Sequence, residues 1–154
     1  MAAAYLDDLL EVMLREHFAG GRKVADDLLS GNGPLAPFSA RIKLAFSLRL
    51  IREDQFNDLE RIRKIRNEFA HGHQGVSFDS QPIRDLCDSL DQLNIVKQFE
   101  ATMSPADREF LVDQFKSRRE RFIGNTVHLA VGLMIRARGD SPLLFEKVNL
   151  DDSV

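Results

Sequence analysis

The spacing of apolar residues predicts three helices in the first fifty residues. Between residues 5 and 14 apolar side chains recur at steps of three and four with charged residues between them, as in an amphipathic helix. Segment 22–29 is expected to turn Val24, Leu28 and Leu29 to one side before two glycines end it. A third helix is expected to begin after Pro37. Its inward face is predicted to hold Ile42, Ala45, Phe46 and Leu50, with Arg41, Lys43 and Arg49 turned elsewhere.

The clearest helical pattern covers residues 53–71. Gly72 follows it and predicts a glycine C-cap. The apolar stripe of this helix consists of Phe56, Leu59, Ile62, Ile65 and Phe69.

Two more helices are predicted in the second half of the chain. Ser80 is placed to cap a helix over 83–94. Ser104 is followed by Pro105 and, three residues after the serine, by Asp107, which is a strong start signal. Apolar residues continue from there to Met134, so one long helix is expected, kinked near Gly124.

These patterns predict an all-α fold. The chain is expected to form one domain, residues 1–154, as a bundle of about five to seven helices with a long C-terminal helix. Residues 139–154 lack a helical pattern and are expected to form an irregular tail, whose apolar residues 143–145 and 148 can pack on a neighbouring surface. The stretch VHLAVGLM, 127–134, is apolar on more than one side, which predicts a second burial surface and therefore a homo-oligomer.

Composition and charge narrow the class of function. The 44% hydrophobic and 29% charged residues are typical of a globular domain. Asp7 and Asp8 interrupt the N-terminus before any apolar run long enough for a secretory leader or a membrane span, so a cytoplasmic protein is expected, and the single cysteine agrees with that. With 21 basic against 24 acidic residues the net charge is -3, so only a local patch can attract nucleic acid.

The run RNEFAH, 66–71, is the main candidate for chemistry. Arg66 borders the apolar stripe, and Asn67 lies one helical turn before His71. An arginine that binds phosphate beside a histidine that moves a proton is suited to RNA cleavage through the ribose 2′-hydroxyl. The same residues are also common at a helix end, where histidine interacts favourably with the helix dipole and an arginine head binds a carboxylate or carbonyl.

Other chemistry has weaker support. The HGH run, 71–73, offers two imidazoles, but a zinc site needs three or four ligands and the sequence indicates no third. Cys87 stands at helical spacing with apolar residues and is interpreted as a small core residue. No glycine-rich phosphate loop follows a strand. We therefore expect neither a metal nor a cofactor.

Two basic runs, RIRKIR at 61–66 and KSRRER at 116–121, remain open to two interpretations. Each is either a solvated helix face beside Glu60 or Glu120, or a set of phosphate contacts.

Two blocks carry a resemblance to a known family. GPLAPFSARIKLAFSLRLI, 33–51, and DLERIRKIRNEFAH, 58–71, resemble the mannitol operon repressor family (MtlR), bacterial regulators of mannitol uptake and utilisation. The resemblance implies an all-helical cytoplasmic regulator that lowers expression of a mannitol operon. Members of the family usually carry glycine where this chain has Ala36 and Arg49; a left-handed backbone at Ala36 would cost about 1 kcal/mol.

The resemblance does not bring a DNA-reading device with it. The turn after Leu50 lacks a glycine and the next helix buries its apolar stripe, so no helix-turn-helix is indicated, and a regulatory protein partner is at least as well supported as operator DNA. RNEFAH is also similar to the RNxxxH signature of HEPN-type ribonucleases, which implies a metal-independent alternative in which Arg66 and His71 act across a dimer, with Asn67 beside them. Candidate contacts with a partner or with nucleic acid are Arg41, Arg63, Lys64, Arg66, His71, Arg118 and Arg119.

Overall fold

The computed structural model describes residues 2–72, 75–90, 103–114 and 116–137. These residues form seven helices and no strand, which confirms the predicted all-α fold. The expected tail, 139–154, lies outside the described residues. No helix in the described part is long and apolar enough to cross a membrane. The helices are α1 (Ala2–Arg15), α2 (Gly21–Leu29), α3 (Phe38–Ser47), α4 (Glu53–His71), α5 (Ile83–Asp88), α7 (Pro105–Gln114) and α8 (Arg118–Ala137).

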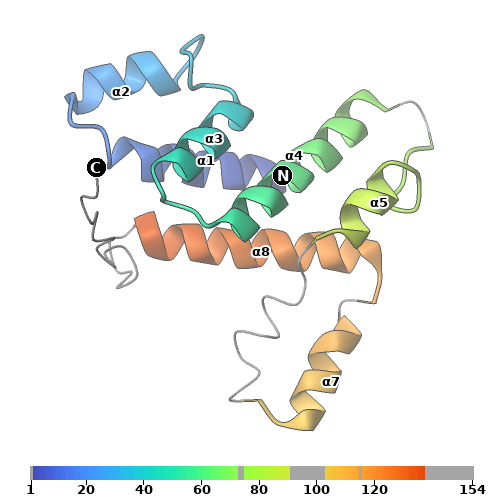
Figure 1. Ribbon diagram of the computed structural model, residues 1–154. Coiled ribbons are helices and arrows are strands. Elements are labelled where there is room, and N and C mark those ends of the chain that lie inside the picture. Colours follow the sequence, from blue (N-terminus) through green and yellow to red (C-terminus); the bar gives the residue numbers. More distant parts are fainter. Residues whose placement is uncertain (1, 73–74, 91–102, 115, 138–154) are drawn as a thin grey trace, which may run out of the picture.

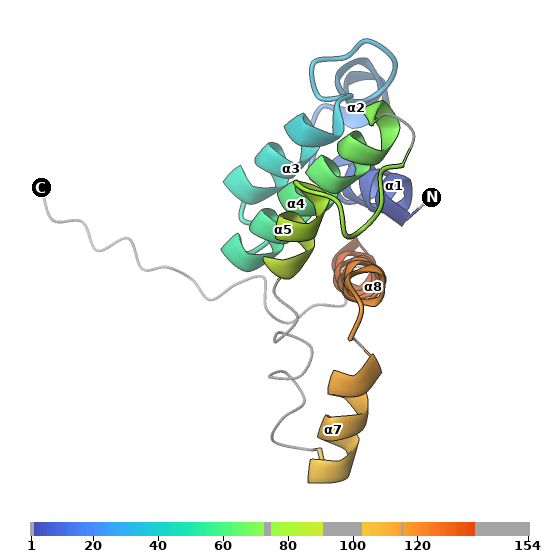
Figure 2. The ribbon, with the colours of Figure 1, turned by 90° about the vertical axis from the view of Figure 1, so that its right-hand side faces the viewer.

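The core lies where α1, α3, α4, α5 and α8 meet. α1 packs along α8 and also contacts α3, while α4 contacts α3, α5 and α8 (Figure 1). The central residues of the predicted α4 stripe, Leu59, Ile62 and Ile65, are fully buried. α7 stands away from the other helices in both ribbon views (Figures 1 and 2). α8 therefore lies between the core of the bundle and α7 (Figure 2).

The end of α3 is a Schellman motif built around Arg49. The Leu50 N–H donates to the Ala45 carbonyl and the Arg49 N–H donates to the Phe46 carbonyl, both at 2.9 Å. Arg49 has φ 57, the left-handed conformation that glycine adopts most easily. Ala36 does not have a positive φ. Of the two positions where the family usually carries glycine, Arg49 has the left-handed conformation and Ala36 does not, so the cost considered for Ala36 does not arise.

The predicted long C-terminal helix is two helices, α7 and α8. The start at Ser104 is confirmed, since its Oγ accepts the Asp107 N–H at 3.2 Å. The break comes before Arg118, where Ser117 and Glu120 form a reciprocal capping box: the Glu120 N–H donates to Ser117 Oγ (3.2 Å) and the Ser117 N–H to the Glu120 carboxylate (2.9 Å). Gly124, where a kink was predicted, lies inside α8, which continues through this position.

Several predicted faces and ends are also corrected. In α2 the buried residues are Ala25 and Leu29, whereas Val24 is exposed. The helix predicted over 83–94 ends at Asp88, and its N-cap is Pro82 rather than Ser80. Three apolar residues expected on inward faces are not buried: Leu28 is half-buried, and Phe46 and Phe69 are exposed.

Gly72 is the C-cap of α4, as predicted, but for a different reason. Its backbone is extended, with φ -68, so the left-handed conformation is not what requires glycine. A Cβ atom at this position would lie 2.5 Å from the Glu68 carbonyl oxygen and 2.5 Å from Val76. Glycine is required here because two neighbours approach it closely.

Candidate functional site: a charged network at the start of α8

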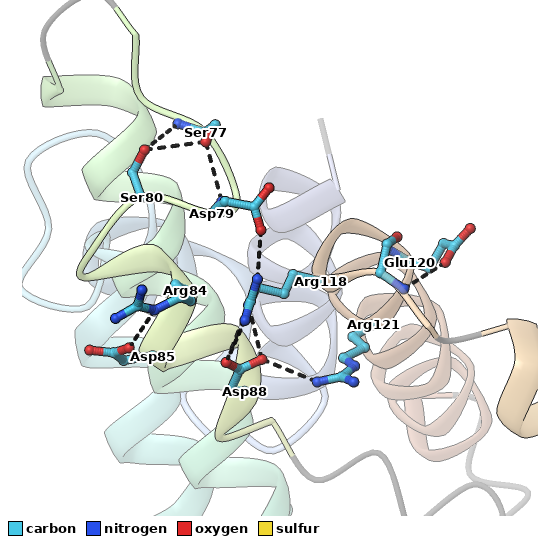
Figure 3. A network of polar contacts seen from close by, with 10 residues as sticks. Ser77, Asp79, Ser80, Arg84, Asp85, Asp88, Arg118, Glu120 and Arg121 are labelled. Carbon is cyan, nitrogen blue, oxygen red and sulfur yellow. Dashed lines mark hydrogen bonds and ion pairs between the residues drawn. The ribbon is translucent and has the colours of Figure 1, made fainter.

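The start of α8 is fixed by its capping box, which sets the direction of the arginines that follow. Arg118 and Arg121 are three residues apart and therefore share one side of the helix. That side faces α5 and the loop before it (Figure 3). The sequence carries a signal for this helix start, S-x-x-E at 117–120. The apolar pattern continues past this signal, and for that reason one uninterrupted helix was predicted.

Arg118 joins three segments of the chain. Its Nη1 donates to Asp79 at 2.6 Å, and its Nε and Nη2 donate to the two oxygens of Asp88 at 3.1 Å each. Arg121 Nη1 donates to Asp88 at 3.1 Å. The hydrogen bonds that Arg118 donates to Asp88 and Asp79 raise the pKa of Arg118. Since these side chains are partly exposed, each ion pair by itself adds little to the stability of the fold. The main effect of the network is to fix the positions of the loop, α5 and α8 relative to one another.

The loop that supplies Asp79 is held by its own serines. The Ser77 N–H donates to Ser80 Oγ at 3.1 Å, and the Asp79 N–H donates to Ser77 Oγ at 3.2 Å (Figure 3). The hydroxyl of Ser80 therefore serves this loop instead of capping α5.

Next to this network lies a surface hollow of about 390 Å³. Its charged lining is mainly basic, with four basic and two acidic side chains, so it suits an acidic group of another molecule. Below it, the rings of Phe69, Phe78 and Phe122 stand 4.9 and 5.6 Å apart and connect α4 to α8. The lining residues are Ser77, Phe78, Asp79, Asp88, Lys116, Ser117, Arg118, Arg119 and Arg121.

The RNEFAH run lies at the exposed C-terminal end of α4. His71 is the last residue of the helix and is exposed, and no hydrogen bond joins it to Asn67. Arg66 is also exposed, and within the described residues its head group makes no hydrogen bond or ion pair, contrary to the expected bond to a carboxylate or carbonyl. A single chain thus does not bring these three residues into a catalytic arrangement.

Arg41 was expected to face away from the core, and the structure buries it. Its guanidinium binds Asp7 and Glu11 of α1 at 2.6 Å each and the carbonyl of Leu29 at 2.7 Å. It also donates to the carbonyl of Leu35 at 3.2 Å. Burial raises the pKa of Asp7, although Arg41 and the nearby Arg66 oppose this. Arg41 is therefore a structural residue that ties α1, α2 and α3 together, and it is not available to a partner.

The basic run at 61–66 is partly neutralised within α4. Arg61 binds Asp58 and Arg63 binds Glu60, both at 2.8 Å. Lys64 is exposed and has no such partner in the described part of the chain. Of the candidate contacts, the structure leaves Lys64, Arg66, His71 and Arg119 at the surface without an ion pair to another described residue.

A separate polar contact joins α4 to α8 and was not predicted from the sequence. Gln55 is buried, and its Oε1 accepts the Arg52 N–H at 3.1 Å and Arg136 Nη1 at 2.6 Å. His128 of α8 also lies near Arg52, and burial together with Arg52 lowers the pKa of His128. No sequence signal joins Gln55 and Arg136, because they are brought together only by the packing of two helices far apart in the chain.

The remaining chemical candidates are accounted for by packing. Cys87 is fully buried, and burial raises the pKa of its thiol to about 11, so it is not a thiolate at neutral pH. His73 lies outside the described residues. Among those that are described, no three His, Cys, Asp or Glu side chains gather as metal ligands would.

Comparison with known proteins identifies the fold and the relatives. A model of the mannitol repressor family (MtlR) matches residues 2–137. The mannitol operon repressors of two Escherichia coli strains, K12 and O6:H1 (CFT073), are each 29% identical over 75 residues, which is 49% of this chain and 38% of the relative. The matched part thus spans well under half the length of these relatives. The X-ray structure of the MtlR–HPr complex from Escherichia coli contains a chain that superposes with a TM-score of 0.61 at 20% identity, covering 86% of this chain and 85% of that one, which shows a shared fold.

Proposed function

The chain belongs to the mannitol repressor family, and from this membership we propose that it regulates transcription in the cytoplasm by lowering expression of a mannitol uptake and utilisation operon. The family match extends from the start of α1 to the end of α8, so it covers every helix of the described structure. The mannitol operon repressors that it matches support the target pathway.

We propose further that the regulator acts through a protein partner rather than by reading operator DNA directly. The observation that carries this proposal is that at least half of the cations in the two basic runs are paired within the chain. Binding to DNA depends on cations that are free to neutralise phosphates. Here Arg61, Arg63, Arg118 and Arg121 are bound to carboxylates of the same chain, and the net charge is -3.

The proposed partner is HPr or a protein of the same kind. The solved relative is described as a complex of MtlR with HPr, and the two chains share a fold. The hollow beside α8 supports the location of the contact, because Arg119 is exposed at its edge without an internal ion pair in the described structure. A cation at such an edge raises the rate and strength of association with an acidic surface.

Titration calorimetry with HPr from the same bacterium tests the partner and the contact separately. Binding by the wild-type chain is expected, and Arg119→Glu is expected to weaken it about tenfold by reversing one contact charge. Lys43→Glu is the matched control, because Lys43 is an exposed cation on α3, away from the hollow, and its change is expected to leave affinity unaltered.

Three results would count against parts of this proposal. No heat of binding to HPr would reject that partner, and equal loss in both variants would reject the hollow as the contact. A specific shift of the operon's promoter DNA by the purified chain alone, at moderate salt, would reject the indirect mechanism.

RNEFAH has no catalytic role in this proposal. The ribonuclease alternative gains no support from the comparisons, which match repressors. Arg66 and His71 are instead proposed as surface residues of α4 that are available to the partner.

A further inference from the structure

α8 has a second apolar face that no described part of the protein covers. Ile123, Val127, Val131 and Ile135 are spaced four residues apart, so they form one stripe along the helix, here termed the α8 stripe. Their exposed fractions are 43%, 56%, 49% and 47%. The opposite face, which includes the buried residue Leu133, packs into the core.

A stripe of this length differs from scattered surface apolar residues. Four β-branched side chains in a row form a contiguous patch, and patches of this kind mark sites that bind something. The predicted breadth of the apolar surface around 127–134 is thereby confirmed for Val127 and Val131.

The charge of α8 indicates the chemistry of the occupant. Arg118 and Arg121 are already paired with Asp79 and Asp88, so the exposed cation in line with the stripe is Arg119, four residues before Ile123. A second copy of α8 laid on the stripe would bring an equal positive charge, and like charges across an interface are unfavourable. An apolar segment with negative charge fits better.

The residues that follow α8 have this chemistry. Residues 139–154 contain four acidic side chains and one lysine, a net charge of -3. Their apolar residues are Leu143, Leu144, Phe145, Val148, Leu150 and Val154.

The chain length allows this segment to reach the stripe. Val127 lies ten residues before the end of α8, a distance of about 15 Å along the helix axis. Leu143 is six residues beyond that end, and an extended chain of six residues spans about 20 Å. Residues 143–148 are therefore within reach of the stripe from Val127 to Ile135.

We propose that residues 139–154 dock on the α8 stripe of the same chain. The apolar side chains cover the stripe while acidic residues of the segment lie beside Arg119. Because the segment is tethered, its effective concentration at the stripe is on the order of millimolar, above that of a second copy at micromolar concentration. Self-association through this face is then the competing state, and the docked segment limits it.

Crosslinking in the full chain tests the proposal. Val127→Cys is combined with Leu144→Cys, and the protein is treated briefly with a short bismaleimide. Cys87 is buried and does not compete. A crosslink within one chain is expected, seen as a monomer band with a crosslinked peptide joining the two positions by mass spectrometry.

The matched control keeps the same tether and removes the docking. In a variant that also carries Phe145→Asp and Val148→Asp, the crosslink is expected to form about tenfold more slowly, because the effective concentration set by the tether alone is unchanged while the apolar contacts are lost. Sedimentation of this variant without the cysteines is expected to show more dimer than the wild type.

Equal crosslinking rates with and without the aspartates would overturn the proposal, because the tether alone would then explain the crosslink. Crosslinked dimers from Val127→Cys alone would overturn it as well, by showing that a second copy occupies the stripe.

Discussion

Replacing Arg49 by glycine is expected to make the protein more stable. Arg49 occupies the position after the α3 C-cap, where the Schellman motif requires a left-handed backbone, and its φ is 57. The side chain is exposed and makes no hydrogen bond or ion pair within the described residues, so its loss removes no contact of the fold seen there.

The magnitude follows from two opposing terms. A non-glycine residue in the left-handed region costs about 1–2 kcal/mol, which glycine avoids. Glycine makes the unfolded chain more flexible, which costs roughly 0.4–1 kcal/mol. We therefore expect Arg49→Gly to raise the free energy of unfolding by about 0.5–1 kcal/mol, with a Tm higher by about 1–4 °C for a domain of this size.

Urea unfolding followed by circular dichroism measures this change. The midpoint is expected to rise with an unchanged slope, since the surface exposed on unfolding stays the same. Ala36→Gly is the matched control, because it also introduces glycine where the family usually has it, but its backbone lacks a positive φ, so a loss of roughly 0.4–1 kcal/mol is expected. An unchanged or lower midpoint for Arg49→Gly, or equal gains in both variants, would refute the reasoning.

Three further predictions concern the buried charge, pH and the RNEFAH run. Arg41→Ala is expected to lower the free energy of unfolding, measured with urea, by about 3 kcal/mol, because two carboxylates and two carbonyls lose their shared donor. This is the low end of the roughly 3–5 kcal/mol expected for breaking a buried ion pair, since the carboxylates are partly exposed. Burial holds the pKa of His128 below its usual 6.5, so the unfolded chain binds the proton more readily than the folded chain. The free energy of unfolding is therefore expected to fall as the pH drops below 6.5, and this fall is expected to be smaller in His128→Asn. Equal pH profiles for the two proteins would contradict this. Labelled single-stranded RNA is expected to stay intact when it is incubated with the wild type in the presence of chelator. His71→Ala is expected to change the free energy of unfolding by less than about 1 kcal/mol. RNA cleavage that leaves 2′,3′-cyclic phosphate ends and is lost in this variant would restore the ribonuclease hypothesis.

The all-α class and the position of the main helices were predictable from sequence because they depend on local periodicity. The centre of the α4 stripe and the cap at Ser104 each depend on residues a few positions apart, and the structure confirms both, although Phe69 at the end of the stripe is exposed. The family was also predictable, since two blocks within residues 33–71 carry specific motifs and the family model matches 2–137.

The break before α8 was a missed sequence signal rather than a tertiary effect. Ser117 and Glu120 are spaced as a capping box, and a capping box ends one helix and begins another even where apolar residues continue on both sides. Local hydrogen bonds took precedence there over hydrophobic pattern.

The sequence alone determined which segments are helical, where most of them start, and which family the chain belongs to, because these features depend on neighbours along the chain. Only the tertiary structure decided what the charged residues do. Arg41 and Arg118 look alike in sequence as exposed cations, yet packing buries one among the carboxylates of α1 and binds the other to Asp79 and Asp88. The partner of a charge is set by helices that are distant in sequence, and in a low-dielectric interior a cation is held only where packing supplies its carboxylates.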